Sequence, residues 1–259
     1  MMKIVDIARM AETSVATVSR VINNDPHVRP ETRKKVQQII DDTKFVPNSA
    51  GKNLRQSKSK KILAVLPTIT NPVYSLLIKG LSDRAKANGY SIVIGVTDRT
   101  PEKEKEYLDM LKTRSVDGVV VFATTLRAAY IESISEKWPI VSCLTPIKGG
   151  NVSYCCIDDT SAAYDATKYL ISLGHKRIAV IRNTFKPISQ DGRDAGYRRA
   201  MEEAGLNIHE QEMFYCEESR QIYDVIATLL NKADRPTAIF SFSDMIAIPA
   251  IKCLSEKGM

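Results

Sequence analysis

The sequence predicts a small all-α head with a helix-turn-helix, followed by a larger α/β part built on parallel sheets. Three observations lead to this fold class. Apolar residues recur at helical spacing over the first 46 residues. From residue 62 onward, short β-branched runs alternate with helical stretches. The charge is also uneven, because residues 1–61 hold 13 Lys and Arg against 6 Asp and Glu, whereas residues 62–259 hold 24 of each.

The composition excludes several classes of protein. With 44% hydrophobic and 26% charged residues, the chain of 259 residues is typical of a globular protein. No apolar run approaches the roughly 20 residues that span a bilayer, and the start MMKIVDIARM lacks the apolar core of a signal peptide, so we expect a cytoplasmic protein. The cysteines are scattered and form no CxxC, which predicts reduced and mostly buried thiols: Cys143, Cys155, Cys156, Cys216 and Cys253.

The head is predicted to contain three helices. The first carries apolar residues at helical spacing: Ile4, Ile7, Ala8 and Ala11. A polar break follows, in which Ser14 can cap a second helix by accepting a backbone N–H hydrogen bond. A third helix begins at Pro30 and closes the core with Val36, Ile39, Ile40, Phe45 and Val46. Two short helices joined by such a turn form a helix-turn-helix, whose second helix can enter the major groove of DNA.

The second helix, in the stretch SVATVSRVIN, has two unlike faces. Val18, Val21 and Ile22 share the apolar face. The opposite face carries Ala16, Arg20 and Asn23, with Val15 near its edge. An arginine among small residues can approach base edges closely, and a basic module joined to a neutral one is typical of nucleic-acid binding. A basic surface without a partner is the alternative.

The head resembles the DNA-binding domain of the lactose/galactose repressor family of bacterial transcription regulators, through IVDIARMAETSVATVSRVINNDPHVRPETRKKV and FVPNSAGKNL. The core TVSRVIN is a specific signal, the resemblance extends along the chain, and it is strongest for the catabolite-control-type members. It implies a helix-turn-helix domain in residues 1–47, a hinge helix and linker in 48–61, and two effector-binding lobes in 62–157 and 158–259. It also implies a homodimer on a pseudo-palindromic operator, acting as a repressor without cofactor or metal.

The resemblance assigns DNA contacts to individual residues of the head. The base-reading positions are Val15, Ala16 and Arg20, and the positions that contact phosphate or seat the helix are Ser14, Thr17, Asn23 and His27. Arg20 is the strongest of them, because a guanidinium can donate two hydrogen bonds to guanine O6 and N7.

The stretch PNSAGKNLRQ resembles the hinge helix of the family. Its DNA-contacting positions are Asn48 and Leu54, and the leucine wedges into the minor groove and kinks the duplex. Gly51-Lys52 departs from the common Ala-Arg. A helix this short is marginal in water, so we expect it to order only beside a second hinge on DNA. A plain flexible linker is the alternative, which the run Ser57–Lys61 resembles.

The α/β part contains six short apolar strands: ILAVLP, SIVIGV, GVVVFA, PIVSCL, RIAVI and AIFSF. The helical stretches between them include residues 74–88, 101–113, 161–172 and 193–204, which predicts parallel sheets covered on both faces. The sequence contains neither GxGxxG nor GxxxxGK[ST], so a dinucleotide or P-loop site has no support. The resemblance implies two α/β lobes like those of a periplasmic sugar-binding protein, with a small sugar-like effector held in the cleft.

Ligands of such sheets bind outside the carboxyl ends of the strands. The positions that match the family's effector site are Tyr74 in NPVY, Asp159 in the crossing Ile157-Asp158-Asp159, Arg193 in GRDAGY and Asp244 in FSFSDMIA. Three of these four residues have an alternative structural role: Tyr74 as part of the lobe core, Arg193 as a solvated residue at a helix start, and Asp244 as a helix N-cap. Ser243 replaces the usual Asn, and Ala163 and Pro249 replace usual glycines, which weakens any transfer of effector identity.

Other functional classes have less support. An enzyme is not expected, because no nucleophile–base pair, metal cluster or phosphate loop is recognisable, and His27, His175 and His209 are isolated in the sequence. A sugar-binding protein without DNA binding is opposed by the basic head. Two variants of the regulator remain open: one whose main co-regulator is a protein, and a truncated fragment that is inactive or dominant-negative. The second arises because the chain stops at Gly258-Met259, where the resemblance implies that a strand follows.

Overall fold

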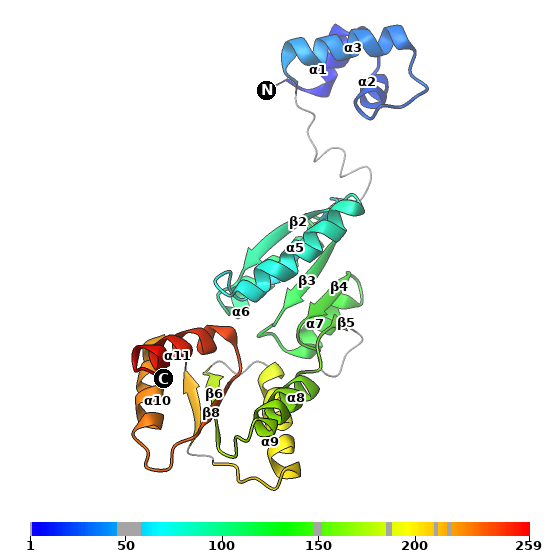
Figure 1. Ribbon diagram of the computed structural model, residues 1–259. Coiled ribbons are helices and arrows are strands. Elements are labelled where there is room, and N and C mark those ends of the chain that lie inside the picture. The colour runs from blue at the N-terminus through cyan, green and yellow to red at the C-terminus, as the bar shows by residue number, and fades with distance from the viewer. Residues whose placement is uncertain (1, 46–57, 148–151, 185–187, 210–211, 217–218) are drawn as a thin grey trace. The chain divides into compact units, whose positions relative to one another are not determined.

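The computed structural model describes residues 2–45, 58–147, 152–184, 188–209, 212–216 and 219–259 (Figure 1). The chain divides into two compact units, Met1–Ser59 and Lys60–Met259. Among the described residues, no helix is long and apolar enough to cross a membrane.

The head unit contains three short helices around one core. They are α1 (Ile4–Met10), α2 (Val15–Ile22) and α3 (Pro30–Thr43). α1 begins where the Lys3 backbone N–H donates to Asp6, and α3 begins at Pro30, which suits a first helical position. Side chains from all three helices fill the core, including Ile7, Val18, Val21 and Val36, and Phe45 closes it. The predicted helical head is confirmed, while Val46 and the predicted hinge lie outside the described residues.

The first sheet of the second unit has five parallel strands in the order β2-β1-β3-β4-β5. They are β1 (Lys61–Leu66), β2 (Ser91–Val96), β3 (Gly118–Phe122), β4 (Ile140–Cys143) and β5 (Ser153–Cys155). The connecting helices are α5 (Pro72–Ala87), α6 (Pro101–Lys112) and α7 (Ala128–Ser135). The strand β5 was not predicted, because three residues are too few to show a strand pattern.

Both faces of the first sheet bury apolar side chains, as its β1 strand shows. Leu63 and Val65 pack with residues of α6 and α7, whereas Ala64 and Leu66 pack on the side of α5. Such alternation places helices on both faces of a parallel sheet (Figure 1).

The second sheet has three parallel strands in the order β7-β6-β8. They are β6 (Ile178–Asn183), β7 (Met213–Cys216) and β8 (Ala238–Ser241). Helices α8 (Asp159–Ser172) and α9 (Ile188–Glu203) lie on one side, and α10 (Ser219–Leu230) and α11 (Asp244–Glu256) on the other (Figure 1). In β6, Ile178 and Val180 pack toward Tyr197 of α9, whereas Ala179 and Ile181 pack toward α10 and α11. The predicted α/β fold class is therefore confirmed.

Helix α9 begins five residues earlier than the stretch 193–204 predicted from sequence. Its first turns, ISQDGR, are polar and contain a glycine, so they read locally as a loop. Arg193 thus lies inside the helix, and its interpretation as a residue at the helix start is wrong.

Helices α8 and α9 touch backbone to backbone at Gly196. A Cβ at this position would overlap the carbonyl oxygen of Thr160 and lie 2.7 Å from the backbone nitrogen of Tyr164. One turn earlier, a Cβ on Gly192 would lie 3.1 Å from the Cβ of Asp159. Both glycines therefore allow α9 to approach the first turns of α8.

The cysteines correct one prediction. All five are free thiols, but only Cys216 and Cys253 are buried. Cys143 is half-buried, and Cys155 and Cys156 are exposed. The expectation of mostly buried thiols is wrong, because β5 is a short strand at the edge of its sheet and leaves its residues uncovered.

We expect Gly196→Ala to lower the free energy of unfolding by roughly 1–3 kcal/mol, because the added methyl group forces α8 and α9 apart. Urea unfolding followed by far-UV circular dichroism measures the change. The matched control is Gly80→Ala in α5, where a Cβ meets no atom within 4 Å. That variant should gain up to about 1 kcal/mol from higher helix propensity. Equal effects of the two substitutions would contradict the close contact.

Candidate functional site

The start of α2 is built by two of the predicted DNA-contacting residues. Ser14 is the N-cap, and its hydroxyl oxygen accepts a hydrogen bond from the Thr17 backbone N–H at 3.1 Å. The two hydroxyl oxygens lie 2.9 Å apart. Capping by a serine stabilises a helix by about 1 kcal/mol, so these side chains begin the helix as well as lying on its outer surface.

The outward face of α2 carries the remaining candidates of that helix. Ala16, Arg20 and Asn23 are exposed, and the side chain of Arg20 is 63% accessible. Asn23 donates from Nδ2 to the Ser19 carbonyl oxygen at 2.8 Å, which orients its amide at the end of the helix. Val15, expected near the edge of this face, is half-buried against the head core and offers only part of its surface outward.

An acid that the sequence analysis missed organises the end of this face. Asp25 accepts a hydrogen bond from the His27 backbone N–H at 2.9 Å, and the His27 ring Nδ1 lies 3.0 Å from the same oxygen. The Arg20 Nε lies 4.0 Å from its other oxygen. The His27 backbone hydrogen bond is the main cause that lowers the pKa of Asp25. The signal was local: an aspartate two residues before a histidine just after a helix can form an Asx turn.

The outward face of α2 therefore presents an exposed arginine beside a small residue, with polar groups on both sides of it. This arrangement suits a helix that enters the major groove, since a guanidinium can read guanine and a methyl side chain leaves room for the approach. The two other DNA-contacting candidates, Asn48 and Leu54, lie outside the described residues.

A second candidate site lies where the chain passes from the first sheet to the second. An open depression of about 490 Å³ is lined by Leu144, Pro146, Cys156, Ile157, Asp158, Asp159, Thr160, Ser189, Asp191 and Gly192. Asp158 is the N-cap of α8 and accepts hydrogen bonds from the backbone N–H groups of Thr160 and Ser161, at 3.1 and 3.0 Å. The Ser161 hydrogen bonds, the backbone one first, lower the pKa of Asp158. Ser189, Asp191 and Gly192 carry no local sequence signal for a binding site.

Two of the four effector candidates meet beside this depression. Arg193 Nε lies 2.8 Å from Asp159 Oδ1, and the Arg193 guanidinium also donates to the carbonyl oxygen of Phe242. The Asp159 side chain is only 11% exposed and that of Arg193 is 31% exposed. Arg193 therefore joins the start of α8 to the carboxyl end of β8.

Asp244 lies two residues beyond Phe242 and is exposed in the first turn of α11. Ser243 is the N-cap of this helix, so the interpretation of Asp244 as the cap is wrong. The hydroxyl oxygen of Ser243 is buried and has no hydrogen-bond partner among the described residues. The carboxylate of Asp244 faces solvent at the same end of the second sheet.

Tyr74 lies in α5 and packs against the first sheet, apart from this group. It is half-buried near the start of α5, and its ring lies edge-on to Phe122 with centroids 6.1 Å apart. Burial raises the pKa of Tyr74, against the opposing effect of the positive charge of Arg99. These contacts match the alternative interpretation of Tyr74 as part of the lobe core.

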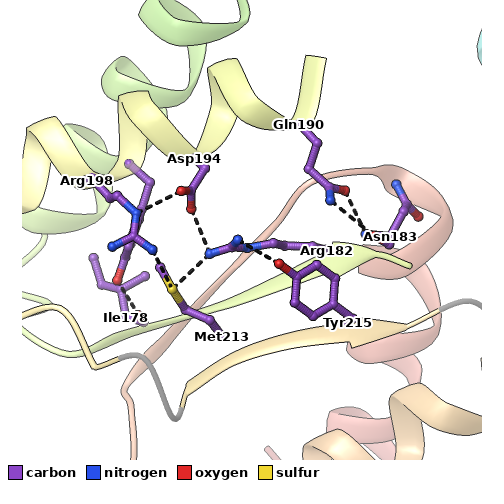
Figure 2. A network of polar contacts seen from close by, with 9 residues as sticks. Ile178, Arg182, Asn183, Gln190, Asp194, Arg198, Met213 and Tyr215 are labelled. Carbon is purple, nitrogen blue, oxygen red and sulfur yellow. Dashed lines mark hydrogen bonds and ion pairs between the residues drawn. The ribbon is translucent and has the colours of Figure 1, made fainter. Parts of the chain in front are cut away.

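A polar network holds α9 against β6 and so supports Arg193 (Figure 2). Arg182 is buried at the end of β6, and its Nη2 lies 2.7 Å from Asp194 Oδ1 of α9. Asp194 also accepts from Arg198 Nε at 2.8 Å. Arg182 further donates to the hydroxyl of Tyr215 at 3.2 Å.

A second connection lies one turn earlier in α9. Gln190 accepts from the Asn183 backbone N–H at 3.1 Å and donates to the Asn183 carbonyl oxygen at 3.2 Å. Because Gln190 and Asp194 flank Arg193 in the helix, these bonds set its position. The sequence pattern indicates none of these contacts between α9 and β6, since each joins a helix to the end of a strand and depends on how the two pack.

Two families of known proteins match this chain. Residues 3–48 match "Bacterial regulatory proteins, lacI family", and residues 59–259 match "Periplasmic binding proteins and sugar binding domain of LacI family". The HTH-type transcriptional regulator DegA of Bacillus subtilis is 35% identical, over 99% of this chain and 77% of its own length. Catabolite control protein A of Priestia megaterium is 32% identical, over 99% of this chain and 78% of its own.

A solved structure shares the fold. The Lac repressor dimer, bound to operator and the anti-inducer ONPF, superposes with a TM-score of 0.86 at 21% identity. The match covers 100% of this chain and 78% of that one.

We expect Arg182→Met to lower the free energy of unfolding by roughly 1–3 kcal/mol, because Asp194 loses a buried charged partner. The same substitution at the exposed Arg84 of α5 is the control and should change stability by less than about 0.5 kcal/mol. Adding Asp194→Leu to Arg182→Met removes the second charge and should recover part of the loss. Urea unfolding measures all three. A double variant no more stable than Arg182→Met alone would show that the pair does not hold α9.

Proposed function

Because the chain belongs to the LacI family of bacterial regulatory proteins, we propose that it is a transcription repressor that binds a pseudo-palindromic operator as a dimer. We also propose that a small, neutral, hydroxyl-rich molecule of the sugar class controls this binding from the second unit.

The exposed guanidinium of Arg20 on the capped helix α2 is the observation that carries the DNA-binding proposal. Its neighbour one turn earlier is Ala16, so the backbone can come close to a base edge. The surrounding excess of Lys and Arg over acids in residues 1–61 attracts phosphate and steers the head to DNA. Base contact by Arg20 then supplies sequence preference, because phosphate contact alone is independent of sequence.

Asp25 is a weak partner of Arg20 that a base of the DNA can replace. Its ion pair with Arg20 spans 4.0 Å between an exposed guanidinium and a half-buried carboxylate, and long pairs near the surface contribute little to stability. The carboxylate holds the arginine near its binding position without a strong bond that must break. Two donor hydrogens of the guanidinium can then turn to guanine O6 and N7.

The charges around the depression favour a neutral ligand. Three lining residues are acids, Asp158, Asp159 and Asp191, and none of the described lining residues is basic. The nearby guanidinium of Arg193 is already paired with Asp159. A phosphate or carboxylate would meet repulsion there, whereas hydroxyl groups can donate to the carboxylates. The match of residues 59–259 to a sugar-binding family agrees with this charge pattern.

We expect Arg20→Ala to remove the preference for one guanine in each half-site, because a bidentate contact is worth about 1–3 kcal/mol of base discrimination. Selection from a random duplex pool by the 259-residue chain, followed by sequencing, measures the preference at every position. Arg9→Ala is the control, since it removes the same charge from an exposed position of α1. It should weaken binding to all sequences alike. If Arg20→Ala enriches the wild-type sequence, the assigned base contact is wrong.

We expect at least one neutral sugar from a panel of monosaccharides and disaccharides to raise the thermal midpoint of unfolding, because a ligand of the folded state stabilises it by mass action. The corresponding sugar phosphates should have no effect. Asp191→Asn is the test variant, because this carboxylate lines the depression and its exposed side chain allows replacement without loss of the fold. It should weaken the shift. Stabilisation by sugar phosphates alone would contradict the proposed ligand class.

A further inference from the structure

Three of the five thiols lie together at one corner of the first sheet. Cys143 ends β4, Cys155 ends β5, and Cys156 follows directly. β4 and β5 are neighbouring parallel strands, and their register pairs Cys143 with Cys155. The backbone N–H of Leu144 donates to the carbonyl oxygen of Cys155 at 2.8 Å, which holds the two strand ends together. Cys143 and Cys155 are twelve positions apart in the sequence.

The register gives the two thiols a geometry that suits a covalent bond. Paired residues of adjacent parallel strands point to the same face of the sheet, and such strands lie about 4.8 Å apart. A disulfide needs a Cα–Cα separation of roughly 4.4–6.8 Å. Cys156 is less suitable, because it faces the depression described above and a bond to its immediate neighbour Cys155 would close a strained ring.

The two thiols also differ in exposure. Cys155 is open to solvent, whereas Cys143 is half-buried against the core that contains Leu66 and Phe122. Burial is the main cause that raises the pKa of Cys143, and the neighbouring thiols add to it. A soluble oxidant therefore reaches Cys155 first. Cys143 lies beside it and can react with the oxidised sulfur of Cys155.

We propose that Cys143 and Cys155 form a reversible disulfide when the protein meets a hydroperoxide. The Cys155 sulfur attacks one peroxide oxygen, the O–O bond breaks, and a sulfenic acid and one molecule of water or alcohol result. The Cys143 sulfur then attacks the sulfenic sulfur, the S–S bond forms, the S–O bond breaks, and a water leaves with the Cys143 proton. The two thiols lose two electrons to the peroxide, and a dithiol restores them by exchange.

The Cys143–Cys155 disulfide would affect the segment that lines one side of the depression. β5 is a short edge strand whose three residues are exposed, and it leads directly into the segment Cys156–Thr160 that lines the depression. A covalent link to β4 would hold the end of β5 in place and restrict that segment. This inference goes beyond the proposed function and does not rest on it.

Neither a disulfide with another cysteine nor a metal site is a supported alternative for these thiols among the described residues. Cys216 and Cys253 are buried in the core of the second sheet. Within the described parts of the chain, no group of three or more His, Cys, Asp or Glu residues could hold a metal ion.

The test treats the reduced 259-residue chain with equimolar hydrogen peroxide, blocks remaining thiols by alkylation and maps tryptic peptides by mass spectrometry without reduction. Lys148 lies between the two cysteines, so trypsin places them in different peptides. We expect one linked pair that joins these peptides, and its loss after treatment with dithiothreitol. Cys216 and Cys253 should be recovered as alkylated thiols.

Two variants decide which thiol of the second peptide takes part. Cys156→Ser should keep the linked pair, and Cys155→Ser should lose it. Hydrogen exchange of residues 153–158 should slow on oxidation in the wild type and in Cys156→Ser, and recover on reduction. A link between Cys155 and Cys156, a link between two chains, or oxidation of Cys155 to sulfinic acid without any link would each overturn the proposal.

Discussion

The backbone contact between α8 and α9 at Gly196 is the constraint on which the second unit's candidate site depends. Because the glycine has no Cβ, α9 lies directly on the Thr160 carbonyl group. This approach brings Asp159, at the start of α8, within 2.8 Å of Arg193. Any larger residue at position 196 would separate the helices and lengthen that ion pair. One small residue thus places two charged groups that lie far apart in the sequence.

The second unit then stabilises this placement through buried polar groups. Arg182 and Asp194 form a pair between β6 and α9, and Gln190 binds the backbone of Asn183 (Figure 2). Buried charges are costly unless they are paired, so these contacts define one position for α9. Because Arg193 lies in α9, its position is set by the same contacts, and its guanidinium donates to the carbonyl oxygen of Phe242 just after β8. The second sheet therefore fixes the position of Arg193 through contacts on both sides of it in the helix.

The two units are specialised by charge. The whole net positive charge of the chain lies in residues 1–61, whereas the lining of the depression in the second unit contains three acids and no basic residue among the described ones. The thiols at the edge of the first sheet add a redox-sensitive element beside that depression. Each feature lies at an exposed helix or strand end, where side chains meet solvent while the elements behind them supply the core.

Several elements follow from residues that are close together in the sequence. The apolar spacing of α2, its cap at Ser14, the start of α3 at Pro30 and the outward Arg20 follow from residues within one or two turns. The β-branched runs likewise predicted β1 and β6 and the α/β class. The early start of α9, the strand β5 and the pairing of Cys143 with Cys155 emerge only in the folded chain. These features arise from contacts between residues distant along the chain, and a local pattern carries no information about which distant residue will lie opposite.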